Sequence, residues 1–134
     1  MMGIVLDTHI LIWLFQGSPK LSEQARLLIE APGNTLFYSI VTPWEIALKR
    51  ERRPETIPID IQTIAWLCTE YDITLLPLGI EHIAYLEQLE YQGSAEHHDP
   101  FDRIMLCQAS VEGMLFLTHD MRLGEYGLAN VLVI

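Results

Sequence analysis

The chain has 134 residues, half of them hydrophobic, and a formal net charge of −10. This length corresponds to about one domain with a sizeable buried core, and we expect a single domain over residues 1–134. The balance of 18 acidic against 8 basic residues argues against a broad nucleic-acid-binding surface, because phosphate contacts need clustered Lys and Arg. It is compatible with a cation site or a basic protein partner.

Nothing in the sequence indicates a membrane protein or a secreted one. The longest apolar run, residues 10–15, is far shorter than the roughly 20 residues that a membrane span needs. The first residues, Met1-Met2-Gly3, place no basic region ahead of an apolar segment. Cys68 and Cys107 fall in apolar helical patterns, which is typical of small core residues in a reducing compartment. We therefore expect a cytoplasmic protein.

In the first half of the chain, short apolar segments alternate with helical patterns. The expected elements are a buried strand at 3–6, helices at 10–15 and 23–30, a strand at 36–38 and a helix from 42 to about 53. The last of these has a marked start. Thr42 suits the N-cap, Pro43 the first helical position and Glu45 the third, as in a capping box.

The second half continues the same alternation. The expected elements are a helix at 60–70, a strand at 74–77, a helix at 80–89, a loop at 92–94, a helix at 101–111, a strand at 114–117, a short irregular or helical piece at 121–127 and a strand at 131–133. Strands this short and apolar, separated by helices, indicate an α/β fold. We expect a central, mostly parallel sheet of four or five strands flanked by helices.

Two acidic residues follow expected strands directly. Asp7 comes after the first strand, and Asp120 closely follows the fourth. In an open parallel sheet, the loops at the carboxyl ends of the strands converge on a crevice at the topological switch point. Both side chains are therefore expected at one edge of the sheet, whereas the sequence leaves open which edge receives the start of the 101–111 helix.

That helix begins with two carboxylates three residues apart. Asp99 precedes Pro100 and is a natural N-cap. Asp102 is harder to explain by capping, because it lies inside the helix and only Arg103 shares its strong polarity in the segment up to Cys107. A buried helix with a doubly acidic start is costly unless a cation lies beside it.

Each acid alone has a structural explanation. Asp7 suits the cap of the following helix, Glu45 the capping box or an i,i+4 pair with Lys49, and Asp120 the closing of a turn. Together they are harder to explain, because two carboxylates about 5 Å apart repel by roughly 3 kcal/mol at an effective dielectric near 20. Their convergence without a partner raises their pKa values or opens the fold.

A divalent cation removes this repulsion. Ligation by oxygen alone favours Mg²⁺, with Mn²⁺ as the other possibility. Zinc is disfavoured, since both cysteines lie in core patterns and no His/Cys spacing forms a ligand set.

Other chemistries have less support. His97 and His98 stand in the loop beside the acids and His119 stands beside Asp120, so each is a weaker candidate for touching substrate or metal. The sequence has no Gly-x-Ser-x-Gly elbow and no Gly-rich phosphate loop. A phosphoryl-accepting Asp7 is a further alternative, but neither lysine of the chain stands near the end of a later strand, where such sites usually want one.

Four short segments resemble a known family when taken together. They are Ile4-Val5-Leu6-Asp7-Thr8, Trp44-Glu45-Ile46-Ala47, His98-Asp99-Pro100-Phe101-Asp102-Arg103 with Gln108-Ala109, and Leu117-Thr118-His119-Asp120. They resemble the four acidic motifs of PIN domains, and most closely those of the VapC-type toxins of bacterial toxin–antitoxin pairs. Each motif is short, but four in this order and at these separations are specific, and they cover essentially the whole chain.

The resemblance implies a Mg²⁺-dependent endoribonuclease in which a metal-activated water attacks an RNA phosphodiester. The acidic set that it implies is Asp7, Glu45, Asp102 and Asp120, with Asp99 as an additional acid and Thr8 and Thr118 as supporting hydroxyls. The products are expected to carry 5′-phosphate and 3′-hydroxyl ends.

The resemblance also implies a homodimer and a small antitoxin whose tail occupies the active groove. The expected contacts with phosphate or with acidic antitoxin residues are Arg50, Arg52, Arg53 and Arg103, with His98 and His119 as weaker candidates. The net charge of −10 stands against this, because an acidic chain is an awkward RNA binder. The alternative is a catalytically weak module of the same fold that acts mainly by binding a partner protein.

Overall fold

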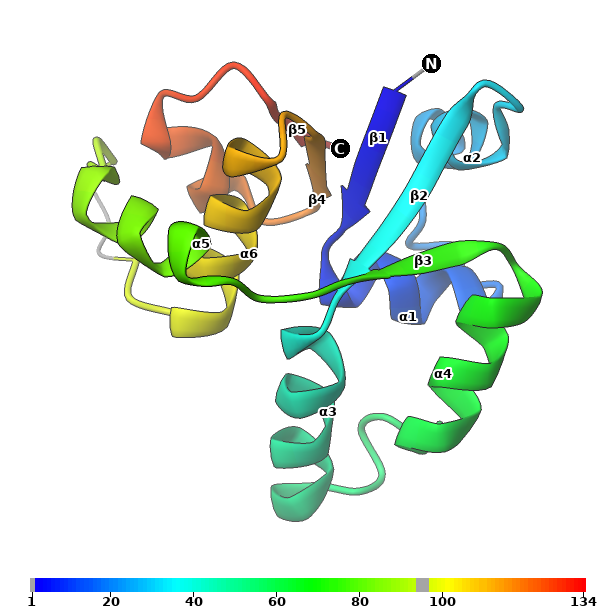
Figure 1. Cartoon of the computed structure of the whole chain (residues 1–134). Helices are drawn as coiled ribbons and strands as arrows, with labels where there is room; N and C mark the ends of the chain where they lie inside the picture. The colour runs from blue at the N-terminus through cyan, green and yellow to red at the C-terminus, as the bar shows by residue number, and fades with distance from the viewer. Residues whose placement is uncertain (1, 94–96) are drawn as a thin grey trace.

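The computed structural model describes residues 2–93 and 97–134. Five parallel strands form one sheet in the order β3-β2-β1-β4-β5 (Figure 1). They are β1 (Met2–Leu6), β2 (Asn34–Ser39), β3 (Ile73–Leu76), β4 (Leu115–Thr118) and β5 (Val131–Val133). The expected α/β fold with a parallel sheet is confirmed. The expected loop at 92–94 ends in Ser94, which lies outside the described residues.

Helices cover both faces of this sheet. They are α1 (Thr8–Gln16), α2 (Glu23–Glu30), α3 (Val41–Arg52), α4 (Ile61–Glu70), α5 (Ile80–Tyr85) and α6 (Pro100–Val111), with 3₁₀ turns η1 (Leu86–Gln88) and η2 (Met121–Tyr126). Within the described residues, no helix has the length and apolar character that crossing a membrane requires.

Successive residues of β1 point to opposite faces, as the pleat requires. Ile4 and Leu6 are fully buried in a core built with α1, α2 and α4, whereas Val5 is buried against α6 and η2. Because β1 is buried on both faces, its sequence is a continuous apolar run without polar alternation.

Two details of the helices differ from the expectation. Helix α3 begins at Val41, so Thr42 lies inside the first turn and is not its N-cap. The Ser39 hydroxyl accepts a hydrogen bond from the Val41 N–H instead, because β2 enters the helix with almost no loop. The expected 80–89 helix ends at Tyr85 and continues as the 3₁₀ turn η1.

The strand order creates the crevice that the sequence predicted. Strand β1 lies between β2 and β4, so the chain reverses its direction of travel across the sheet beside β1. Asp7 follows β1 and donates its backbone N–H to the carbonyl of Leu117 in β4, at 3.0 Å. Asp120 stands two residues beyond the end of β4. The two side chains thus leave neighbouring strands at the same edge, where ligands bind in open α/β sheets.

Candidate active site

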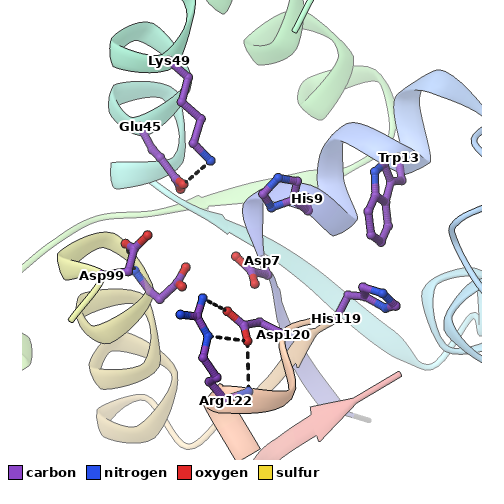
Figure 2. Close-up of a pocket in the computed structure, with 10 residues that line it drawn as sticks. Asp7, His9, Trp13, Glu45, Lys49, Asp99, His119, Asp120 and Arg122 are labelled. Atoms are coloured by element: carbon purple, nitrogen blue, oxygen red, sulfur yellow. Dashed lines mark hydrogen bonds and ion pairs between the residues drawn. The ribbon is translucent and has the colours of Figure 1, made fainter. Parts of the chain in front are cut away.

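Five carboxylates line one hollow of about 360 Å³ at this edge (Figure 2). They come from the end of β1, from α3, from the start of α6 and from the start of η2. The residues that line it are Asp7, His9, Trp13, Glu45, Lys49, Asp99, Asp102, His119, Asp120 and Arg122. The structure therefore brings together all five acids that the sequence singled out, and it answers which sheet edge receives the start of α6.

The Asp7 carboxylate accepts hydrogen bonds from a backbone amide and from a side-chain hydroxyl. Its Oδ1 accepts the Thr8 N–H at 2.7 Å, and its Oδ2 accepts the Thr118 hydroxyl at 2.6 Å. Burial nevertheless raises the pKa of Asp7 to about 6, because desolvation outweighs these hydrogen bonds. The Thr118 hydroxyl also accepts the Asp120 N–H at 3.1 Å, so one side chain ties Asp7 to the backbone of Asp120.

Glu45 is buried and has two partners. Its Oε1 accepts the Thr8 hydroxyl at 2.7 Å, and its Oε2 lies 2.9 Å from the Lys49 ammonium, four residues along α3. The Thr8 hydroxyl lies 3.0 Å from that of Thr42. Thr8 and Thr118 therefore both contact acids of the hollow, and the i,i+4 pair considered from the sequence is present.

Asp102 is the most perturbed acid of the hollow. Burial, and next the charges of Asp7 and Asp99, raise its pKa to about 8. The ring of His97, which is 3% exposed, lies with Nε2 3.3 Å from Asp102 Oδ2 and Nδ1 2.7 Å from the Tyr126 hydroxyl. Burial lowers the pKa of His97, which favours the neutral ring.

Asp99 caps α6, as the sequence predicted, and it also lies in the hollow. Its Oδ1 accepts the backbone N–H groups of Phe101 and Asp102, at 2.9 and 3.1 Å, and so caps α6. The same side chain lines the hollow. Capping and a place in the acidic site are therefore compatible.

Asp120 is paired with a nearby arginine. Arg122 donates from Nε to Oδ1 at 3.1 Å and from Nη2 to Oδ2 at 2.8 Å, a bidentate pair that lowers the pKa of Asp120 (Figure 2). Asp120 Oδ1 also accepts the Arg122 N–H at 2.9 Å, which caps η2.

The hollow is lined by the cations Lys49 and Arg122, which are not among the residues that we expect to contact phosphate or the antitoxin. Arg50 donates to the carbonyl of Ile57 at 2.7 Å, and Arg50, Arg103 and His98 are not among the described residues that line the hollow. His119 does line the hollow. Its Nδ1 donates to the carbonyl of Ile134 at 2.6 Å, and its ring packs edge-on against Trp13, with ring centroids 5.1 Å apart.

Sequence reasoning missed Lys49 and Arg122 as members of the site and gave His97 little weight. Lys49 had been considered only as a structural partner of Glu45, and Arg122 stands in a stretch without clear periodicity. Two signals were present. Lys49 is one turn after an acidic site residue on the same helix, and Arg122 is two residues after another.

Among the described residues, two groups of three side chains each bring three possible metal-ligand atoms within 4.8 Å of one another. One is His97, Asp102 and Asp120. Both ring nitrogens of His97 are engaged, and Arg122 holds both oxygens of Asp120. We therefore interpret the closeness of this group as hydrogen bonding around Asp102.

The other group is Glu81, His82 and Glu112. His82 Nδ1 accepts the Gly79 N–H at 2.8 Å, so the neutral ring carries its proton on Nε2 and donates it to Glu112, also at 2.8 Å. This arrangement joins the start of α5 to the end of α6 and leaves no lone pair on the buried imidazole for a metal.

The donor set of the acidic hollow fits Mg²⁺ or Mn²⁺. Its carboxylate oxygens are the ligands that these hard cations prefer. Within the described residues, Asp7 and Asp102 form no ion pair with a Lys or Arg. Burial, together with the charges of neighbouring carboxylates, raises the pKa of both side chains and so disfavours their ionised forms. A divalent cation would supply positive charge that favours them.

A parallel sheet with carboxylates gathered at its switch point defines a class of acidic-site α/β domains, and sequence comparison identifies the family. The family model described as PIN domain matches residues 4–128, so the chain belongs to the PIN domain family. No curated protein matches the chain.

Solved structures of similar fold come from toxin–antitoxin complexes. The VapBC2 structure from Rickettsia felis, bound to a promoter DNA fragment, aligns with a TM-score of 0.70 at 15% identity, over 99% of this chain and 98% of that one. VapBC-1 from nontypeable Haemophilus influenzae gives 0.68 at 17% identity, over 98% of each chain. DNA-bound VapBC from Salmonella typhimurium gives 0.63 at 15% identity, over 100% and 98%. At these identities the likeness is one of fold.

Proposed function

We propose that this protein is a Mg²⁺-dependent endoribonuclease and the toxin of a type II toxin–antitoxin pair, with Mn²⁺ as an alternative ion. The observation that carries the proposal is the pair Asp7 and Asp102. Both are buried carboxylates with raised pKa values in a hollow lined by three further acids. Strongly perturbed titratable groups gathered in a cleft are typical of catalytic sites, and PIN domains are generally nucleases.

The metal would be held by Asp7 and Asp102, with Glu45, Asp99 and Asp120 as the further candidate ligands. Such an ion, when bound, lowers the pKa of a water molecule and stabilises the charge that develops on the phosphate. The protein prepares for it by orienting the ligands. Thr118 fixes Asp7 Oδ2, Thr8 fixes Glu45 Oε1 and His97 fixes Asp102 Oδ2.

The chemistry is hydrolysis of a phosphodiester. A carboxylate of the hollow accepts a proton from the attacking water as the new P–O bond forms. The P–O3′ bond breaks and the leaving O3′ takes a proton, which leaves 5′-phosphate and 3′-hydroxyl ends. Glu45 and Asp120 line the same hollow as Asp7 and Asp102, and we propose them as the candidate proton acceptors.

We propose RNA and a small antitoxin as partners, a homodimer as the assembly and the cytoplasm as the place of action. The similar folds come from VapBC complexes, which supports an antitoxin partner. A second hollow shares Glu45, Lys49 and Asp99 with the acidic one and is bordered by Pro100 and Phe101. An antitoxin tail with one apolar and one basic side chain would fit across the two.

The test is cleavage of RNA by purified, antitoxin-free protein. With Mg²⁺ we expect cleavage that leaves 5′-phosphate ends, and we expect Asp7→Asn and Asp102→Asn each to abolish it together with growth inhibition. Full activity in both variants, or in excess EDTA, would contradict the proposal.

The second candidate function is a catalytically weak module that acts by binding its partner. The observation that favours it is the pairing of Glu45 with Lys49 and of Asp120 with Arg122, which leaves fewer acids for a metal. Antitoxin binding without RNA cleavage in either Mg²⁺ or Mn²⁺ would support this alternative.

A further inference from the structure

The acids of the hollow differ in how their charge is balanced. Glu45 is paired with Lys49, and Asp120 is paired with Arg122 through two hydrogen bonds (Figure 2). Both cations belong to this chain and both line the hollow. The remaining acids of the predicted catalytic set, Asp7 and Asp102, are bonded to hydroxyl, amide and imidazole groups instead.

From this division we propose that Lys49 and Arg122 are built-in counterions, which limit the acidic site to one divalent ion and compete with any further metal for Glu45 and Asp120. The inference rests on the proposed function, because it concerns the metal that the nuclease would use. It goes further by giving the site a stoichiometry and by giving two residues outside the acidic motifs a role.

The charges are the first argument. Carboxylates bind metal in the deprotonated form, so four carboxylate ligands with one ammonium and one guanidinium carry a net charge of −2, which a single Mg²⁺ or Mn²⁺ neutralises. A second divalent ion would make the set positive unless Lys49 and Arg122 moved away. Asp99 adds a further carboxylate, but its Oδ1 is engaged by the first turn of α6, where the helix dipole already stabilises negative charge.

The anchoring of the two cations is the second argument. Glu45 is 3% exposed, so Lys49 neutralises a buried carboxylate, and the loss of such a partner is expensive. Asp120 uses both oxygens for Arg122 and also caps η2 through Oδ1. A metal that recruited Asp120 would have to break a bidentate pair and disturb this cap, whereas one that used Asp7 and Asp102 would break no ion pair.

Metal binding without RNA tests the proposal. In calorimetric titration of metal-stripped protein with Mn²⁺, we expect one ion per chain for the wild type. Lys49→Met and Arg122→Met should each bind Mn²⁺ several-fold more tightly, and the double variant should take up a second ion. Lys49→Arg keeps the charge and should keep the wild-type affinity and stoichiometry.

The matched controls are Lys20→Met and Arg52→Met. Both remove one positive charge close to the hollow, but within the described residues neither side chain forms an ion pair with its acids. Lys20 lies over the ring of Trp13, 6.0 Å from its centroid, and Arg52 is exposed near the end of α3. Each control should change Mn²⁺ affinity much less than its counterpart, because a charge without a direct ion pair to a ligand acts on the metal only through solvent and salt.

The outcomes separate this inference from the proposed function. Two ions of similar affinity in the wild type would overturn the counterion role and leave the nuclease intact, as would variants that bind Mn²⁺ no more tightly than their controls. A wild type that binds no Mn²⁺ would contradict the metal-dependent function itself. Arg122 is half exposed at the surface, so Arg122→Met decides the matter even if Lys49→Met fails to fold.

Discussion

Asp102 links the protonation of one side chain to the stability of the whole fold. Its pKa is raised to about 8 by burial and by neighbouring carboxylates, from a value of 3.8 when unperturbed. The native state therefore holds a proton that the unfolded state has lost between about pH 4 and pH 8, and stability falls as the pH rises through this window. Below the unfolded pKa the contribution is fully present.

We predict a pH-dependent loss of stability in EDTA that depends on Asp102. Between pH 6.5 and 8.5 the free energy of unfolding should fall by roughly 2 kcal/mol, since each unit of pKa shift corresponds to about 1.4 kcal/mol. Urea denaturation at the two pH values measures it. Asp102→Asn, which is neutral throughout, should remove most of this dependence, and saturating Mg²⁺ should abolish it in the wild type. Equal pH slopes for variant and wild type would show that burial of Asp102 is not its cause.

His97 is the second residue whose contacts predict a measurable role. It connects the buried Tyr126 hydroxyl to Asp102 Oδ2, and partners of this kind around a metal ligand typically contribute 10- to 100-fold in metal affinity. We expect His97→Ala to weaken Mn²⁺ binding about 10-fold in calorimetric titration. His97→Gln, which retains an N–H donor, should lose less. Unchanged affinity in His97→Ala would assign the histidine to packing alone.

At the scale of elements, α6 is fixed to the sheet by a buried polar side chain. Gln108 accepts the Ser39 hydroxyl and donates to the carbonyls of Leu76 and Pro77, at 3.3 and 3.1 Å. It thereby joins α6 to the ends of β2 and β3, and these bonds set how far along the sheet the first turn of α6, with Asp102, comes to lie.

We predict that Gln108→Leu destabilises the fold by about 2–3 kcal/mol, because the buried Ser39 hydroxyl loses its acceptor and the carbonyls of Leu76 and Pro77 each lose one N–H donor. Urea denaturation gives this value. Gln24→Leu, on the exposed face of α2, is the matched control and should stay within about 0.5 kcal/mol. A similar small effect for Gln108→Leu would mean that apolar packing alone positions α6.

What the sequence could predict about the site follows from its elements. Asp7 and Asp120 stand at the ends of apolar segments, and parallel strands bring such positions to one edge whatever the details of the packing. The sequence does not predict which edge of the sheet receives the start of α6, because the pattern of an apolar helix shows which face is buried but not which end meets the carboxyl ends of the strands. Arg122 was missed because an arginine beside an aspartate looks like any exposed pair until the fold turns it toward the hollow.

On the scale of the whole molecule, the central question is how a chain of net charge −10 would bind the RNA that we propose as its substrate. The bases are unevenly placed. Besides the hollow bordered by Pro100 and Phe101, two others adjoin the acidic one through Lys49. One is lined also by Arg52, Arg53 and Thr56, and the other by Lys20, His9 and Trp13. Positive charge is thus concentrated beside the acidic hollow, in the last turn of α3 and at Lys20, which follows α1. This gives an acidic protein a short basic path to its site.

We predict that this path, and not the net charge, governs RNA binding. For a single strand, log K falls with log [salt] by about 0.7 for each phosphate neutralised, so three or four contacts give a slope between about −2 and −3. Fluorescence anisotropy with the inactive Asp7→Asn protein and a short single-stranded RNA measures this slope. Lys20→Gln and Arg52→Gln, each added to that background, should reduce it by about 0.7. Arg26→Gln should not, because Arg26 donates to the carbonyl of Ser18 and lines neither hollow. An equal reduction by all three substitutions would show that RNA responds to overall charge, and the basic path would then have no special part in binding.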